Sequence, residues 1–196
     1  MRSTAALASL GLLLFTLAGK VSIPGLWIYL AVAVLHQIIS LWLIVPRYPA
    51  YVALHEARRA RHANVKVWDQ AILWALAGAT FIMYTLAALD LGRLHLGNLS
   101  LWLAIPGVVF CVVGSTLNQW AIVHNPHFER GVRIQHERDH RVVQTGPYRY
   151  VRHPGYLGRV LFYVAFPLIS GSLLALAGGL LGMGGVLLRT SLEDKT

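Results

Sequence analysis

Five apolar blocks, separated by polar segments, define the pattern of this chain. The blocks are Ala5–Gly19, Leu26–Val45, Gln70–Leu89, Leu99–Val123 and Leu157–Leu188. The middle three have about the 20 residues that a helix needs to cross a bilayer, whereas the first is rather short. The last block is too long for one span and too short for two full ones, and its glycines and Pro167 favour a hairpin of two short helices packed through small residues. The pattern predicts an all-α integral membrane protein with about five to six transmembrane helices.

Polar residues at the ends of these blocks give further local expectations. The first block follows Arg2 as the apolar core of a signal peptide would. It has no convincing small-x-small cleavage site with a soluble mature domain behind it, so a first membrane helix is expected. Asp69 is placed to cap the helix Gln70–Leu89. Pro106 predicts a kink within the fourth block. Asn118 and Gln119 lie at a depth where polar side chains usually face protein or a cavity.

Composition and charge agree with a membrane protein. The 196 residues are 56% hydrophobic and 13% charged, and a soluble protein so apolar could not cover its surface with polar groups. A net charge of +9 would suit nucleic acid, yet the cations gather in segments 46–69 and 124–156, whereas segments 20–25 and 90–98 hold one each. An even number of crossings between the two basic segments puts both on one side, which should be the cytoplasm. No nucleic-acid partner is expected, and segment 47–69 is predicted to form a helix on anionic lipid headgroups.

The chain length suits a single domain with two parts. Residues 1–123 would hold transmembrane helices and the basic segment 46–69, and residues 124–196 a polar loop, the hairpin and the C-terminal residues. The single cysteine, Cys111, lies in an apolar block, so an intrachain disulfide is impossible and an oxidising compartment is not implied.

The polar run from His140 to Gly158 is the strongest candidate for a site. It contains two turn signals, Gly146-Pro147 and Pro154-Gly155, between which the chain must bend. Two such bends next to apolar blocks predict a cup at the membrane surface. Its side chains would be those of Tyr148, Tyr150, Arg152, His153 and Tyr156.

This run carries the pattern H-x-V-V-x-x-G-P-Y-x-x-x-R-H-P-x-Y-x-G, which resembles the cofactor motif of the isoprenylcysteine carboxyl methyltransferase family. Members of that family are membrane enzymes that use S-adenosylmethionine. Asn125-Pro-His-Phe128 and Val132-Arg-Ile-Gln135 are similar to its bacterial branch, and Arg189-x-x-x-Glu193 resembles the start of its second motif. The resemblance runs from about Leu99 onward and implies a bacterial inner-membrane protein whose site faces the cytoplasm.

This chain differs from the family at its C-terminus. The acidic pair of the second motif reads Glu193-Asp194 here. The family continues into a further helix and an aromatic, basic tail that covers the site, whereas this sequence ends at Thr196. A C-terminally short relative is therefore expected.

The resemblance and the chemistry of the side chains together suggest roles. Glu193 would meet the cofactor ammonium, His140 and His153 its carboxylate, and tyrosine rings its sulfonium. Arg189 would hold the carboxylate of a lipid-like acceptor as the catalytic residue, and a base is unnecessary because that nucleophile is already ionised. The expected cofactor-binding residues are His140, Val142, Val143, Gly146, Tyr148, Arg152, His153, Pro154, Tyr156 and Glu193.

Other functions stay open at the level of sequence. The acceptor is a prenylcysteine carboxylate, another lipid carboxylate, or a lipid amine, for which Glu137, Asp139 or a histidine would act as base. His136 and His140 have the i, i+4 spacing of metal ligands, but the His-x-x-His-His boxes of membrane di-iron enzymes are missing, so no metal is expected. An NADPH-dependent sterol reductase and an inactive relative are further alternatives. In the inactive case, Arg189-x-x-x-Glu193 would be only an ion pair on a solvated helix end.

Overall fold

A computed structural model of the chain describes residues 2–44, 66–125 and 143–195. These residues form helices joined by short connections, and the prediction of an all-α protein is confirmed. The α-helices are α1 (Arg2–Ala18), α2 (Pro24–Ile39), α4 (Val67–Leu89), α5 (Ala104–His124), α6 (Pro154–Ser170) and α7 (Leu173–Glu193). Shorter helical turns are η1 (Ser40–Ile44), η2 (Asp90–Leu94), η3 (Leu101–Leu103) and η4 (Gly146–Arg149).

Most of these helices have the length and composition of membrane spans. Pro24–Leu43, Val67–Leu94, Leu101–His124 and Leu173–Glu193 are each long and apolar enough to cross a bilayer. Ala5–Ala18 is apolar but shorter, as expected from the sequence. The prediction of an integral membrane protein is thus confirmed.

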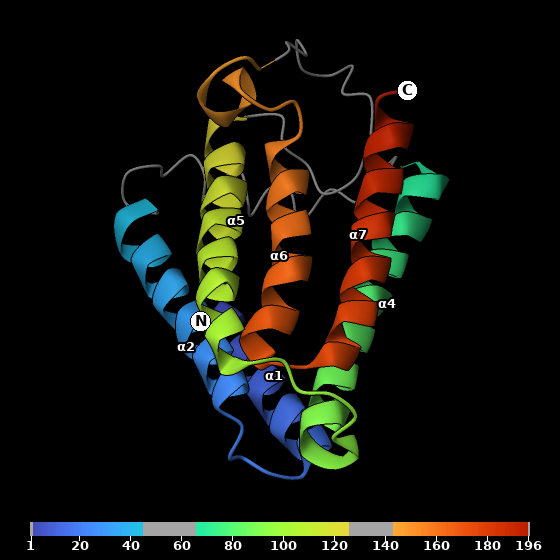
Figure 1. The fold of residues 1–196 in the computed structure, drawn as a ribbon. Coiled ribbons are helices and arrows are strands. Elements are labelled where there is room, and N and C mark those ends of the chain that lie inside the picture. The colour runs from blue at the N-terminus through green and yellow to red at the C-terminus, as the bar shows by residue number, and fades with distance from the viewer. Residues whose placement is uncertain (1, 45–65, 126–142, 196) are drawn as a thin grey trace.

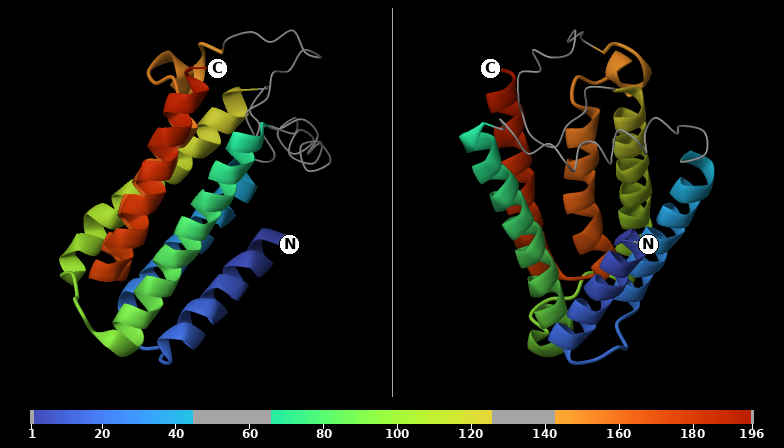
Figure 2. Two further views of the ribbon diagram at one scale, coloured as in Figure 1. Left: turned by 90° about the vertical axis from the view of Figure 1, so that its right-hand side faces the viewer. Right: turned by 180° about the vertical axis from the view of Figure 1, so that it is seen from behind.

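The helices run up and down, and the helix ends that flank the two basic segments gather at one end of the bundle (Figures 1 and 2). The C-terminal ends of α2, α5 and α7 lie at that end, together with the N-terminal ends of α4 and α6. We call it the polar end; it also holds η4. α5 packs along α6, α6 along α7, and α7 along α4. The predicted hairpin is therefore confirmed as α6 and α7, although α7 is a full-length span rather than a short helix.

Glycines allow these helices to approach closely. A Cβ at Gly114 of α5 would lie 2.8 Å from the carbonyl oxygen of Gly158 on α6. A Cβ at Gly178 of α7 would lie 2.6 Å from the Cα of Met83 on α4, and one at Gly182 would enter the ring of Tyr163. The expected packing through small residues is confirmed for the hairpin and extends to α4.

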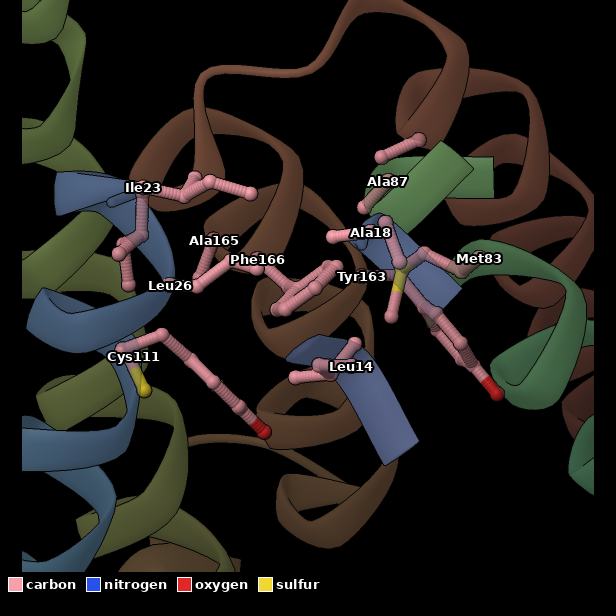
Figure 3. Close-up of a cluster of buried hydrophobic side chains, with 14 of the residues drawn as sticks. Leu14, Ala18, Ile23, Leu26, Met83, Ala87, Cys111, Tyr163, Ala165 and Phe166 are labelled. Atoms are coloured by element: carbon pink, nitrogen blue, oxygen red, sulfur yellow. The ribbon is translucent and has the colours of Figure 1, made fainter. Parts of the chain in front are cut away.

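An apolar cluster fills the space where α1, α2, α4, α5 and α6 meet (Figure 3). Aromatic rings dominate it: Phe166 packs edge-on against Tyr29 and Tyr84, with ring centroids 4.8 and 4.7 Å away. The hydroxyls of Tyr29 and Tyr84 satisfy each other at 2.7 Å. Other members are Leu14, Ala18, Ile23, Leu26, Met83, Ala87, Cys111, Tyr163 and Ala165.

At the end opposite the polar end, Asp90 joins several segments through hydrogen bonds. The sequence placed it in a short connection between two apolar blocks. Its buried carboxylate accepts hydrogen bonds from the Ser172 hydroxyl at 2.6 Å and from the backbone N–H groups of Leu96 and Leu174 at 3.0 and 3.3 Å. Ser172 in turn caps α7 by accepting from the N–H of Ala175. Asp90 thus joins the end of α4 to the α6–α7 turn.

Two local predictions are wrong. Asp69 does not cap its helix: the N–H groups of Asp69 and Gln70 already donate to the carbonyl of Lys66, so α4 begins before Asp69, whose carboxylate faces another helix. Pro106 does not kink a span, because α5 begins at Ala104 and a proline in the first turn removes no helical hydrogen bond.

Other expectations have mixed outcomes. Gln119 faces protein, as predicted, and donates to the hydroxyl of Ser40 at 2.5 Å. The predicted surface helix in segment 47–69 lies mostly outside the described residues.

Candidate active site at the polar end

The first of the two predicted bends is a helical turn, η4, held against the end of α5. Gly146 has φ +59°, in the left-handed region that favours glycine, and a Cβ there would lie 2.6 Å from the ring of His124. Pro147 is buried, and the amide of Asn125 donates to the hydroxyl of Tyr148 at 3.2 Å. The Gly-Pro signal therefore formed a turn, as predicted, and Tyr148 lies next to the end of α5.

The second bend lies at the start of α6 and places the imidazole of His153 next to the end of α7. His153 is the N-cap residue and Pro154 takes the first helical position, where its fixed φ suits a helix. The Nε2–H of His153 donates to the Oδ1 of Asp194 at 2.8 Å. The His153 ring also stacks on Tyr156, with centroids 5.3 Å apart and planes at 9°. His153 is thereby fixed from two sides.

Tyr156, in the first turn of α6, is the centre of the cluster. Its hydroxyl donates to the carboxylate of Glu193, the last residue of α7. Its ring also receives the guanidinium of Arg189, whose Cζ lies 5.2 Å from the ring centroid. Burial raises the pKa of the Tyr156 hydroxyl well above its usual value, and Arg189 opposes the shift only in part. The hydroxyl is therefore a permanent donor near neutral pH.

Arg189 has a partner that the sequence did not suggest. Its Nε–H and an Nη2–H donate to the two oxygens of Asp69 on α4, at 2.7 and 3.2 Å. The Asp69 side chain is fully buried and that of Arg189 is 9% exposed. A forked pair of this kind is the strongest arrangement that a guanidinium and a carboxylate can form. The available signal was an acidic residue directly before the apolar block Gln70–Leu89, since ionisable side chains that enter a membrane are usually paired.

The chain matches a known family over the segment that carries His153, Tyr156, Arg189 and Glu193. Residues 107–195 match the model of the Isoprenylcysteine carboxyl methyltransferase (ICMT) family. The resemblance predicted from the motifs is confirmed over this segment. Two proteins named "Probable protein-S-isoprenylcysteine O-methyltransferase", from Oryza sativa subsp. indica and subsp. japonica, are each 34% identical to the chain over 59 residues. This stretch covers 30% of the chain and 31% of each rice protein, and no solved structure matches.

The ICMT-like segment contains both halves of the cluster at the polar end. His153 and Tyr156 come from its middle, and Arg189 and Glu193 come from its end. Because α7 runs to Glu193, Arg189 and Glu193 lie one helical turn apart on the same face of α7. Each has a partner on another helix, Asp69 and Tyr156 respectively, so the pattern is more than an ion pair within α7.

The remaining predicted site residues differ in their surroundings. Val143 and Gly146 are half-buried, Pro154 is buried, and Arg152 is exposed. Tyr150, which was predicted to line the cup, is 74% exposed and lies outside the cluster around Tyr156. His140 and Val142 lie outside the described residues, as does His136. Within residues 2–44, 66–125 and 143–195, no group of three or more His, Cys, Asp or Glu side chains is placed to hold a metal ion.

Proposed function

We propose that the protein is a membrane methyltransferase that uses S-adenosylmethionine to methylate the carboxylate of a prenylcysteine or another lipid-like acceptor. One observation carries the proposal. Two parts of the ICMT-like segment meet at the polar end through the pairs His153–Asp194 and Tyr156–Glu193, which are 41 and 37 residues apart in the chain. The names of the rice relatives support the choice of acceptor.

The donor set at the polar end fits S-adenosylmethionine. A carboxylate has about four acceptor sites, so Glu193 can take a cofactor ammonium while it keeps the hydrogen bond from Tyr156. The face of an aromatic ring attracts cations, which suits a sulfonium. His153, whose Nδ1 also carries a proton in the imidazolium form, and the turn Gly146–Arg149 are proposed to hold the cofactor carboxylate. His140, Val142, Val143, Tyr148, Arg152 and Pro154 remain proposed members of the same site.

The reaction then needs positioning more than proton transfer. The cofactor supplies a methyl group bound to a positively charged sulfur, and the acceptor carboxylate is already a nucleophile. The protein has to hold the two reactants in line and exclude water. Arg189 is the proposed holder of the acceptor carboxylate.

The membrane setting suits a lipid-like acceptor. The helices that end at the polar end expose large apolar side chains along their length, such as Trp74, Leu180 and Leu187, so an acceptor dissolved in the bilayer can reach this end laterally. We place the polar end on the cytoplasmic side, because the two basic segments join the helices there and the cofactor is made in the cytosol. For a bacterial protein this means the inner membrane.

The proposal is tested with membranes from cells that express the protein, incubated with methyl-labelled S-adenosylmethionine and an S-prenylcysteine. We expect label in the prenylcysteine as a methyl ester, which alkali releases as methanol. Membranes with the Glu193→Gln variant should incorporate far less. Label that resists alkali and enters a lipid amine would instead assign an N-methyltransferase, and incorporation equal to that of membranes without the protein would refute the proposal.

A further inference from the structure

Asp69 lies outside residues 107–195, yet it reaches the centre of the cluster at the polar end. It belongs to the first turn of α4 and contacts Arg189 across 120 positions of the chain. We infer that Asp69 is a positioning residue, which orients Arg189 for the acceptor carboxylate. The inference rests on the proposed function and adds α4 to the helices that form its site.

The α4–α7 pair has packing contacts besides this ion pair. α7 already packs on α4 through Gly178 against Met83 and through Gly185 against Leu76. The hydroxyl of Tyr163, on α6, forms hydrogen bonds with the α4 residues Thr80 and Leu76, so α4 is also held by a third helix. Removing two charges from water is costly, and apolar residues of similar volume are often as stable. The buried Asp69–Arg189 pair is therefore better explained by the role proposed for the Arg189 guanidinium in the site than by a contribution to stability.

The geometry shows how Asp69 would act through Arg189. Contacts of Nε–H and Nη2–H with the two carboxylate oxygens fix the plane of the guanidinium as well as its position. That guanidinium lies over the ring of Tyr156, whose hydroxyl holds Glu193. Arg189 is thus held at one edge by Asp69 and at one face by Tyr156. Without Asp69 the long Arg189 side chain would sample other rotamers.

The Asp69→Asn variant keeps the size of the side chain but replaces one acceptor oxygen with an NH₂ group that opposes the Arg189 donors. A small displacement of a positioning group can lower the rate about 100-fold, so we expect kcat/KM for the acceptor to fall about 10- to 100-fold. The dissociation constant of S-adenosylmethionine should change by less than about threefold, because that ligand is assigned to Glu193. Asp69→Glu, which restores the carboxylate, should recover part of the loss.

Asp90→Asn is the matched control. Asp90 is as buried as Asp69 and also accepts several hydrogen bonds, but it lies at the opposite end of the bundle. Both variants are expected to lower the melting temperature in detergent, whereas only Asp69→Asn should lower kcat/KM of the folded protein. A second readout is the rate at which phenylglyoxal modifies Arg189, followed by peptide mass spectrometry. This rate should rise in Asp69→Asn and not in Asp90→Asn.

The outcomes separate this inference from the proposed function. If the parent methylates S-prenylcysteine and Asp69→Asn does so with kcat/KM within about threefold, Asp69 is only structural and the inference is overturned. An unchanged rate of Arg189 modification in Asp69→Asn would overturn it as well. If the parent itself transfers no methyl group to S-prenylcysteine or to a membrane lipid, the proposed function fails, and this role of Asp69 fails with it.

Discussion

Tyr156→Phe probes the contact that joins the two halves of the cluster. The change removes one hydroxyl and leaves the ring that stacks on His153 and lies beneath Arg189. Glu193 then loses the donor that orients it. A hydrogen bond to a charged group contributes about 1.5–3 kcal/mol, and the lower value applies here because Glu193 is only half-buried. Since 1.4 kcal/mol corresponds to tenfold, we expect S-adenosylmethionine to bind about tenfold more weakly.

The assay is isothermal titration of purified protein in detergent with S-adenosylmethionine. Tyr150→Phe is the control, because Tyr150 belongs to the same segment but is 74% exposed and should bind like the parent. A double variant adds a stricter condition. Once Glu193→Gln has been made, Tyr156→Phe should cost little more, since the two side chains act as one unit. Equal affinities for Tyr156→Phe, Tyr150→Phe and the parent would refute the reasoning.

Three further predictions concern the site, the packing and the topology. His153→Ala should also weaken S-adenosylmethionine binding about tenfold, and titration should show no such loss for the exposed neighbour Arg149→Ala. Gly182→Ala should destabilise the protein by about 1–3 kcal/mol by overpacking, seen as a lower melting temperature; Gly184→Ala, which has open space around its Cβ, should not. Single cysteines at Arg149 and Leu96, with the native cysteine removed, should be labelled by an impermeant reagent from opposite sides of the membrane, and labelling of both from one side would contradict the fold.

The parts of the fold that follow local rules could be predicted from the sequence. Apolar runs of membrane length became helices, and the glycines of the last block became contacts between α6, α7 and α4. The Gly146-Pro147 and Pro154-Gly155 signals became a turn and a helix start because both depend on backbone conformations set by neighbouring residues. For the same reason the shared face of Arg189 and Glu193 could be predicted from the spacing alone.

The parts that depend on distant partners could not be predicted. Asp69 has the sequence context of a helix cap, and only the packing of α7 on α4 shows that its partner is Arg189. Asp90 looked like a residue of an exposed connection, but the α6–α7 turn buries it and supplies Ser172 as a donor. In both cases a carboxylate in an apolar setting needs a partner, and local sequence does not say where in the chain that partner lies.

Methyl transfer by purified protein is the most direct test of the central claim. The parent, Glu193→Gln and Tyr150→Phe would be reconstituted in lipid vesicles with S-adenosylmethionine and an S-prenylcysteine, and the methyl ester would be quantified by mass spectrometry. The account predicts ester formation by the parent and by Tyr150→Phe at similar rates, and a strongly reduced rate for Glu193→Gln. Absence of ester with the parent, or equal rates for all three proteins, would contradict it.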